Sequence, residues 1–511
     1  MTAVQSSLGA RSVSAFLWGG GGAFLRLFMQ MGAQIVLARL LGPEQYGLFA
    51  MSVVVMSFAA FFSDIGMAYG LIQQKTLDES HVRFVFGWQL ILGTAVALVL
   101  ALLAHPLADF FREPRLPAII LALAPLAFLQ AVSAVSLNLL KRELDFKTLQ
   151  IAQTVAYFFG YVCLGIPLAL GGAGVWALVA AWGAQSLISL ALIYRAARHP
   201  LVPVFTHPDA RSMGHFGGTV LLTNMTNWLI GNVDRTVVAR TLDSASMGIY
   251  SNAYNLVNTP SSTVLGFMQP VMYSACARVQ EDPQRIRKAY LLLMAGIGLT
   301  VMPVFFAMSA VSETLVLALY GPHWAQAAEV LRPIALAMPV ALLWGITTPV
   351  LWNTGQVTLE FKLQLPLAGL WLLGAWAAAQ ASLAALAWTV LGLFILRTLV
   401  FTRLAIRQIS VRWLDCARAL RGGLVLAACA MLAGWGADHV LAATLPGSQI
   451  RLAAIVLACA AAVGLALRLL PGLFIPELAD MLRMGLGRLP RAAARAAGWL
   501  LAPQLGSAHA R

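Results

Sequence analysis

Long apolar runs separated by short polar turns make up most of the chain. An α-helix needs about 20 apolar residues to cross the hydrocarbon core of a membrane, and fourteen runs come close to that length. They lie at residues 14–38, 46–72, 84–104, 117–140, 150–171, 174–194, 216–240, 247–275, 289–310, 327–352, 361–379, 382–402, 422–441 and 451–470. A tight turn joins the runs 361–379 and 382–402, which predicts a helical hairpin. The pattern predicts an all-α integral membrane protein with about fourteen transmembrane helices.

Composition supports this prediction and excludes several classes of function. Hydrophobic residues make up 60% of the chain and charged residues only 11%, whereas soluble proteins carry about 25% charged residues. The five cysteines form no CxxC pair, and the eight histidines follow no metal-ligand spacing, so neither a disulfide framework nor a metal site is expected. We also expect no cofactor. The connections between the runs are too short for a soluble catalytic domain, so we do not expect an enzyme.

The positions of the basic residues predict the orientation in the membrane. A formal net charge of +14 would suggest a nucleic-acid partner for a soluble protein. In a membrane protein, basic cytoplasmic loops account for such a charge, so no nucleic-acid partner is expected. If the N-terminus lies inside, 24 of the 34 Lys and Arg residues fall on the inner side and 6 on the outer side. This bias predicts that both termini are cytoplasmic. The first apolar run shows no signal-peptide cleavage site and is expected to remain as a span.

The chain contains an internal repeat with a shift of 201 residues. The shift places "IVLARLLGPEQYGLFA" (35–50) on "TVVARTLDSASMGIYS" (236–251), and the first span on the seventh. The identical pairs are Val36 and Val237, Ala38 and Ala239, Arg39 and Arg240, Leu41 and Leu242, and Gly47 and Gly248. Six spans per repeat is an even number, so both halves share one orientation and are expected to face a central cavity.

This repeat predicts the domain organisation. We expect a six-helix bundle at 1–205, a second at 206–410 and two additional transmembrane helices at 411–475. A basic cytoplasmic tail is expected at 476–511. The tail reads as a basic amphipathic helix on the membrane surface, with a frayed tail as the alternative.

Polar residues inside the first and seventh spans are the candidate functional residues. Arg26, Gln30 and Gln34 follow an i, i+4, i+8 spacing and therefore share one helix face. The repeat maps this face onto Asn227, Gly231 and Arg235. Such stripes are not expected to face lipid, so we expect them to line a hydrated cavity.

Arginine in a cavity favours an anionic substrate, because its planar fork donates paired hydrogen bonds to phosphate and stays charged. We predict substrate binding by residues on these polar faces, namely Arg26, Gln30, Gln34, Asp64, Asn227, Asp234 and Arg235. Two alternatives remain open. Asp64 and Asp234 are either counter-ions of the cavity or structural partners in ion pairs with Arg26 and Arg235. Arg39 and Arg240, each at the outer end of a helix, favour a capping role instead.

Two further stretches are expected to be structural. The glycines 19–22 lie inside the first span and are not followed by the lysine of a phosphate loop, so they indicate close helix packing. The segment 320–333 reads as a turn at the outer membrane interface, with Trp324 as its anchor.

Several sequence blocks resemble one known family. The stretch "VLARLLGPEQYGLFAMSVVVMSFAAFFSDIGMAYGLIQQ" (36–74) looks like the signature of bacterial polysaccharide flippases of the Wzx type. These belong to the multidrug/oligosaccharidyl-lipid/polysaccharide exporter superfamily. The stretches "LLKRELDFKTLQ" (139–150), "GIYSNAYNLVNTP" (248–260) and "YGPHWAQAAEVLRPIAL" (320–336) resemble further blocks of its colanic-acid-exporter-like branch. The resemblance extends from about residue 10 to about residue 410.

The resemblance implies a function for the cavity. Such proteins carry an undecaprenyl-pyrophosphate-linked oligosaccharide across the bacterial inner membrane while two bundles alternate between inward- and outward-open states. Arg26 and Arg235 would correspond to the cavity arginines of the family. The implied partners are the lipid-linked oligosaccharide, membrane lipids, and the polymerase and chain-length machinery, and a monomer is expected. Two alternatives remain: a cation-coupled small-molecule antiporter of the same fold, and a flippase of peptidoglycan lipid precursors.

Overall fold

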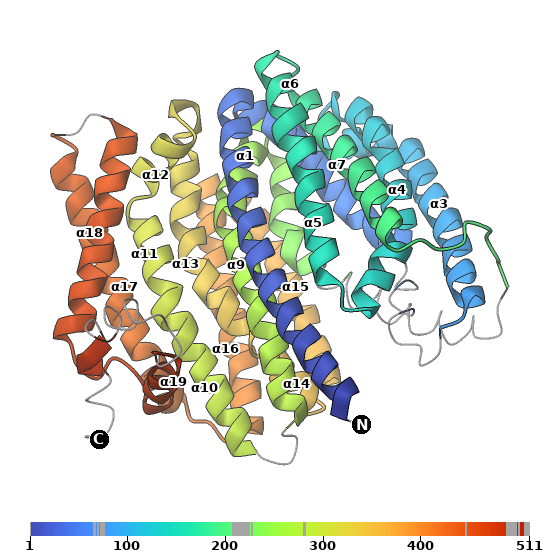
Figure 1. Ribbon diagram of the computed structural model, residues 1–511. Coiled ribbons are helices and arrows are strands. Elements are labelled where there is room, and N and C mark those ends of the chain that lie inside the picture. Colours follow the sequence, from blue (N-terminus) through green and yellow to red (C-terminus); the bar gives the residue numbers. More distant parts are fainter. Residues whose placement is uncertain are drawn as a thin grey trace. The chain divides into compact units, whose positions relative to one another are not determined.

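The computed structural model is helical in nearly all the residues that it describes (Figure 1). The structure describes residues 2–64, 68, 71, 77–206, 225, 228–278, 283–444, 447–486, 498 and 501–504. Within these ranges, the side chains of residues 2–21, 23–24, 64, 270–271, 274–275, 277–278, 283 and 484–486 are not described. The chain divides into two compact units, Met1–Ser251 and Asn252–Arg511. The predicted boundary at residue 205 follows the sequence repeat and stays a prediction.

The first unit holds the helices of the predicted spans 1 to 7. They are α1 (Thr2–Asp64), α3 (Glu79–Phe111), α4 (Leu116–Arg142), α5 (Phe146–Tyr157), the π-helix η1 (Phe158–Gly165), α6 (Ile166–Leu170), α7 (Val175–Ala196), a helix at residues 228–241 and the start of α9 (Ser244–Arg278). The first two predicted spans form one element, because α1 turns at Gly42 without ending. Gly42 has φ 71° and ψ 173°, a conformation that glycine adopts without strain.

The second unit continues from α9. It contains α10 (Pro283–Thr300), α11 (Met302–Ala310), α12 (Ser312–Leu319), the short η2 (Pro322–Trp324), α13 (Ala327–Gly345), α14 (Thr348–Asn353), α15 (Val357–Ala379), α16 (Leu383–Gln408), α17 (Trp413–Leu441), α18 (Ser448–Leu469) and α19 (Pro476–Leu486). The predicted hairpin is confirmed, because α15 and α16 pack together across a short turn. The Ser382 hydroxyl caps α16 by accepting the backbone N–H of Ala385 at 3.0 Å.

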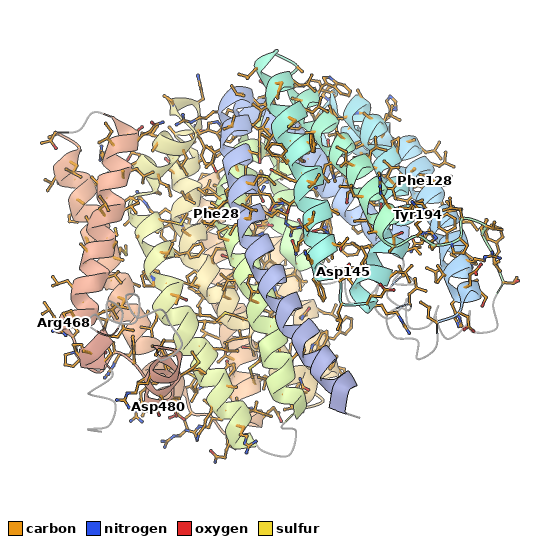
Figure 2. The ribbon with its side chains drawn as sticks, viewed as in Figure 1. Phe28, Phe128, Asp145, Tyr194, Arg468 and Asp480 are labelled. Carbon is orange, nitrogen blue, oxygen red and sulfur yellow. The ribbon has the colours of Figure 1, made fainter. Side chains whose placement is uncertain are left out.

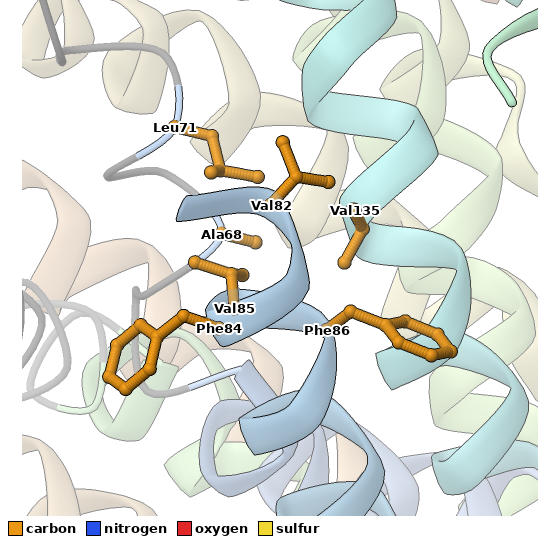
Figure 3. Packing of buried hydrophobic residues seen from close by; sticks show 7 residues of the cluster. All are labelled: Ala68, Leu71, Val82, Phe84, Val85, Phe86 and Val135. Atoms are coloured by element: carbon orange, nitrogen blue, oxygen red, sulfur yellow. The ribbon is translucent and has the colours of Figure 1, made fainter. Parts of the chain in front are cut away.

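The all-α membrane fold is confirmed. Within the described ranges, 10 helices are long and apolar enough to cross a membrane. The count of fourteen stays a prediction, because several predicted spans include residues outside the described ranges. A buried apolar cluster joins the start of α3 to α4 and to residues 68 and 71, as Figure 3 shows. Phe84 and Phe86 lie on different sides of the first turns of α3, so this helix end is packed on more than one face.

A contact between two turns reproduces the repeat in three dimensions. At Gly47 in α1, a Cβ atom would lie 1.6 Å from the carbonyl oxygen of Ser244, and at Gly248 in α9 it would lie 1.9 Å from that of Pro43. The shift of 201 residues relates Pro43 to Ser244 and Gly47 to Gly248, so the two contacts are pseudosymmetric. We call this contact the glycine crossing. Only glycine permits so close an approach of two backbones.

Arg115 links the same two turns through an ion-pair cluster. Its Nε and Nη2 donate to Glu113 Oε1 at 2.8 Å and Oε2 at 3.0 Å, in the paired geometry that makes such bonds strong. Its Nη1 donates to Glu44 Oε1 at 2.7 Å, and Nη2 also reaches Ser244 Oγ at 3.4 Å. Arg115 therefore holds together the α3–α4 turn and the two turns of the glycine crossing.

The Arg115 cluster predicts a loss of stability in acid. The hydrogen bonds from Arg115 lower the pKa of Glu113, against the opposing effect of burial. A carboxyl with a lowered pKa stabilises the folded state above its ordinary pKa, and this contribution is lost as the pH falls toward the lowered value. We expect Glu113→Gln to lower the thermal unfolding midpoint at pH 7, and the difference from wild type to shrink as the pH falls below about 4.3. A difference that stays constant from pH 7 to pH 3.5 would contradict this account.

The prediction for Trp324 was wrong. Trp324 is 0% exposed, and its ring centroid lies 5.7 Å from that of Tyr320. A membrane-interface anchor must reach the lipid headgroups, and this indole is enclosed by protein instead. The turn ends where α13 begins at Ala327, earlier than predicted, and Trp324 within it belongs to the buried part of the second unit. In α19, Leu478 and Ala479 are buried in the protein while Met481 is 45% exposed, and the membrane-surface role of the tail stays a prediction. Residues 487–497 lie outside the described part of the chain.

Candidate functional site

The candidate site begins at a contact between α1 and α5. Three pairs lie about one helix turn apart along it, and we call this set the α1–α5 ladder. It consists of Gly22 beside Gln150, Arg26 bonded to Gln153, and Gln30 bonded to Tyr157. At Gly22 a Cβ atom would lie 3.1 Å from the Gln150 side chain, which confirms close packing at this glycine. The small residue thus brings the two helices together just before the polar pairs.

Arg26 is half-buried in this ladder, and its Nη1 donates a hydrogen bond to Gln153 Oε1. Arg26 meets α5 through its guanidinium and Gln30 through its backbone carbonyl, and the role of both residues in substrate binding stays a prediction. Leu25 and Phe28 are 63% and 70% exposed, so an apolar face of α1 adjoins the polar one. The ladder holds the arginine in place and uses one of its five N–H donors. The others remain available to an anionic oxygen, because no carboxylate among the described side chains pairs with Arg26.

The helix opposite Arg26 has an unusual shape. Asp145 caps α5 by accepting the backbone N–H of Thr148 at 3.1 Å, and Figure 2 labels it at the start of that helix. Tyr157 donates to the backbone carbonyl of Gln30 at 3.5 Å and stacks on Tyr161 with ring centroids 4.6 Å apart. The π-helix η1 starts directly after Tyr157, and π-helical turns are frequent at functional sites. Sequence reasoning missed Gln153, Tyr157 and Tyr161, because nothing in their spacing pointed to α1.

Asp234 is a tether between two helices in this structure. It is 2% exposed, and its Oδ2 accepts the hydroxyl hydrogen of Tyr250 at 2.6 Å. Its Oδ1 accepts the backbone N–H of Arg235 at 2.9 Å. Leaving a buried polar group without its partner costs about 1–3 kcal/mol, so this bond firmly joins the helix at 228–241 to α9. The sequence did not predict this bond to Tyr250, and the ion pair with Arg235 and the counter-ion role of Asp234 both stay predictions.

The other predicted residues have different surroundings. Arg235 and Gln34 are half-buried, and their roles stay predictions. Asn227 and the side chain of Asp64 lie outside the described residues, so neither the polar face at Asn227 nor an Arg26–Asp64 ion pair is tested. The repeat-related Arg39 and Arg240 differ. Arg39 is exposed, whereas Arg240 places its Cζ 5.3 Å from the centroid of the Phe110 ring.

Sequence reasoning also missed a buried carboxylate in the second unit. Glu360 lies one residue before the predicted span 361–379, but α15 starts at Val357 and places it inside the helix. It is 4% exposed. Its oxygens accept hydrogen bonds from Trp352 Nε1 at 2.8 Å, Gln364 Nε2 at 3.2 Å and Thr348 Oγ1 at 3.3 Å.

Arg397 on α16 is a buried cation in the same unit as this carboxylate. It is 4% exposed, and its Cζ lies 3.6 Å from the centroid of the Trp344 ring on α13. An unpaired buried charge destabilises a protein by about 3–5 kcal/mol, while a desolvated cation–π contact returns only about 2 kcal/mol. The negative charge of Glu360 favours the charged form of Arg397. No ion pair joins the two side chains in the part of the chain that the structure describes. The presence of Arg397 in a span was visible in the sequence; its burial was not.

Metal-ligand geometry is absent from the described part of the chain, where no three His, Cys, Asp or Glu side chains are placed to hold an ion. The fold is similar to that of a known integral membrane protein. A structure of the lipid II flippase MurJ in an inward closed conformation matches 89% of this chain and 99% of that chain, with a TM-score of 0.70 and 12% identity. At this identity the likeness shows the fold alone.

The family follows from the sequence comparison. Residues 36–329 match the model of the polysaccharide biosynthesis protein family, and the chain belongs to that family. It is similar to the succinoglycan biosynthesis transport protein ExoT of Rhizobium meliloti (strain 1021), with 26% identity over 326 residues, 64% of this chain and 66% of that protein. It is also similar to the lipopolysaccharide biosynthesis protein WzxC of Escherichia coli (strain K12), with 24% identity over 371 residues, 70% of this chain and 73% of that protein. The match to ExoT spans just under two thirds of that relative. Family and fold together define a multi-pass membrane protein of polysaccharide biosynthesis.

Proposed function

We propose that the protein moves undecaprenyl-pyrophosphate-linked oligosaccharide repeat units across the bacterial inner membrane, for exopolysaccharide, capsule or lipopolysaccharide synthesis. The observation that carries the proposal is the half-buried Arg26, held by Gln153 within the α1–α5 ladder of a chain in this family. An arginine at this depth costs about 2.5–3.5 kcal/mol on insertion scales. An anionic cargo that crosses the membrane beside Arg26 explains why the chain keeps an arginine there despite this unfavourable insertion free energy.

The chemistry of the cargo suits this arrangement. A pyrophosphate presents several anionic oxygens, and the guanidinium fork donates to two of them at once. The polyprenyl tail stays in the bilayer, because moving a long hydrocarbon through a polar path has no compensating interaction. We propose that Arg26 and Arg235 contact the pyrophosphate in turn while the protein alternates between inward- and outward-open states. We propose that Tyr161, which is half-buried and stacks on the buried Tyr157, contacts the apolar face of a sugar ring.

The location and partners form part of the same proposal. We propose that both termini are cytoplasmic, which the bias of basic residues toward one side supports. The partners are the lipid-linked oligosaccharide and membrane lipids, with the polymerase and chain-length machinery next in the pathway, and the protein acts as a monomer.

The charges inside the helices speak against a carrier of cationic drugs. Such a carrier needs carboxylates that are open to the cargo. The buried carboxylates Asp234 and Glu360 already accept hydrogen bonds, Asp234 from Tyr250 and Glu360 from Trp352, Gln364 and Thr348. The likeness to a lipid II flippase supports the fold but not that substrate, and the family match favours polysaccharide precursors.

Deleting the gene tests the proposal. We expect surface polysaccharide to disappear while lipid-linked repeat units accumulate in the inner leaflet, because synthesis continues but translocation stops. The measurement is radiolabelled lipid extraction together with an assay of surface polymer. Restoring the gene on a plasmid is the control. Unchanged surface polymer, or loss of polymer without any accumulated precursor, would refute the flippase function.

A further inference from the structure

Arg397 is a cation enclosed in the second unit without an acceptor for its N–H groups. It is 4% exposed, and it forms no hydrogen bond and no ion pair with any residue that the structure describes. The guanidinium lies over the Trp344 ring, 3.6 Å from Cζ to the ring centroid. A ring face attracts the charge of a guanidinium but does not accept its five in-plane N–H donors. Arg397 therefore lacks the hydrogen-bond acceptors that buried arginines normally have.

The nearby carboxylate does not meet this need. Glu360 on α15 directs its oxygens to three neutral donors, from Trp352, Gln364 and Thr348. No ion pair joins the two side chains in the described part of the chain, and the Nε of Arg397 is a buried donor without an acceptor among the described residues. The Nε1 of Trp344, directly beside the guanidinium, is a second buried donor without an acceptor among the described residues. Unpaired donors on two adjacent side chains, from α13 and α16, indicate a missing acceptor.

We propose that Arg397 and Trp344 form a second anion site, which takes a phosphate or carboxylate oxygen of the cargo, with Glu360 as its resident counter-ion. The site goes beyond the one around Arg26, because Arg397 lies in the second unit. Its use in transport rests on the proposed function, whereas its ability to bind an anion does not. The anionic oxygen has two sources in such a cargo: the pyrophosphate link and a uronic acid in the sugar chain.

This site makes anion binding depend on the protonation of Glu360. An ionised Glu360 neutralises Arg397 and repels an incoming anion, whereas a protonated Glu360 does neither. Anion affinity therefore rises as the pH falls. The other titratable group acting on Arg397 is Tyr254 on α9. From α14, only Thr348 and Trp352 contact Glu360, and neither is charged. The charged residues of α13 lie in its first turns. Lys362 on α15 and Arg403 on α16 are exposed.

Binding of simple anions to the purified full chain tests the site. The protein is reconstituted in nanodiscs of uncharged phosphatidylcholine, and every sample carries Arg26→Gln and Arg235→Gln, so that anions at the first site do not contribute. The probes are inorganic pyrophosphate in one arm and glucuronate in the other, and the readout is the thermal unfolding midpoint against probe concentration. We expect at least one probe to bind, and the tighter one identifies the source of the oxygen.

Four variants show whether each side chain strengthens or weakens anion binding. Arg397→Gln is expected to weaken binding about tenfold or more, because a charge-assisted hydrogen bond is lost. Arg397→Lys keeps the charge but not the fork, so binding should fall by less. Glu360→Gln is expected to tighten binding about fivefold and to remove its pH dependence. Arg403→Gln, six residues along the same helix and exposed, is the matched control and should bind normally.

Specific outcomes overturn the proposal. It fails if neither probe binds, if Arg397→Gln binds as well as the control, or if Glu360→Gln weakens binding. The last result would show that Glu360 and Arg397 only support each other structurally. Glu360→Gln leaves Arg397 in place, so the test survives even if Arg397→Gln does not fold. If anion binding at Arg397 is not found but Arg26 variants lose export as expected, the second site is wrong and the proposed function remains supported.

Discussion

Replacing Arg26 with alanine is expected to reduce export of the polysaccharide about tenfold or more, because a charge-assisted hydrogen bond to the cargo contributes about 1.5–3 kcal/mol. Arg26→Lys should retain part of the activity, since a lysine keeps the charge but cannot form the paired bonds of a guanidinium. Gln153→Leu removes the acceptor that positions Arg26 and should reduce export less than Arg26→Ala does. The measurement is surface polymer divided by the amount of protein in the membrane.

Protein abundance separates this role from a structural one. We expect Arg26→Ala to accumulate in the membrane near the wild-type level. Arg407→Ala, an exposed arginine of α16, is the control for the loss of a positive charge and should export normally. If abundance falls in parallel with export, the bond between Arg26 and Gln153 serves to pack α1 against α5, and the substrate role is wrong.

Replacing Gly47 with alanine is expected to destabilise the folded protein by about 3 kcal/mol or more, among the largest effects of a single substitution. The new Cβ atom would lie 1.6 Å from the carbonyl oxygen of Ser244, so the backbone of one turn must move. Gly248→Ala should have a similar effect, because its Cβ atom would meet the carbonyl oxygen of Pro43 at 1.9 Å. The measurement is the thermal unfolding midpoint of the detergent-purified protein.

Two other glycines provide controls with the opposite sign. At Gly32 and Gly231, no described atom lies within 4 Å of the position that a Cβ atom would take. Alanine at these sites should be neutral or slightly stabilising, since glycine in a helix is less favourable than alanine by about 1 kcal/mol. If Gly47→Ala and Gly32→Ala have equal midpoints, the two turns do not touch in the purified protein and the glycine crossing is wrong.

The positions of most helices could be predicted from the sequence, because a spanning helix requires a long apolar run and leaves a strong local signal. The turn at Gly42 and the hairpin of α15 and α16 were predicted in this way. The errors occurred where polar residues lie inside protein rather than lipid. Glu360 was placed before a helix that in fact contains it, and Trp324 was assigned to the membrane interface although it is buried.

The site could be predicted only in part. The i, i+4 spacing identified Arg26 and Gln30 as one face, because helix geometry is local. The partner residues could not be found, since Gln153 lies 127 residues from Arg26 and no spacing rule connects them. Asp234 shows the same limit: its charge was visible in the sequence, but its bond to Tyr250 depends on how the helix at 228–241 meets α9.

The sequence by itself determined the membrane class, the all-helical fold, the repeat and the family resemblance. Each of these depends on patterns along one chain: the length of apolar runs, the charge bias, the periodicity and the residues within short blocks. Only the tertiary structure decided which polar groups have partners. It joined Arg26 to Gln153, brought Gly47 and Gly248 into contact, and enclosed Arg397 over Trp344 without an acceptor. The physical reason is that burial and hydrogen bonding arise between helices distant in sequence, and no local pattern encodes the distances between them.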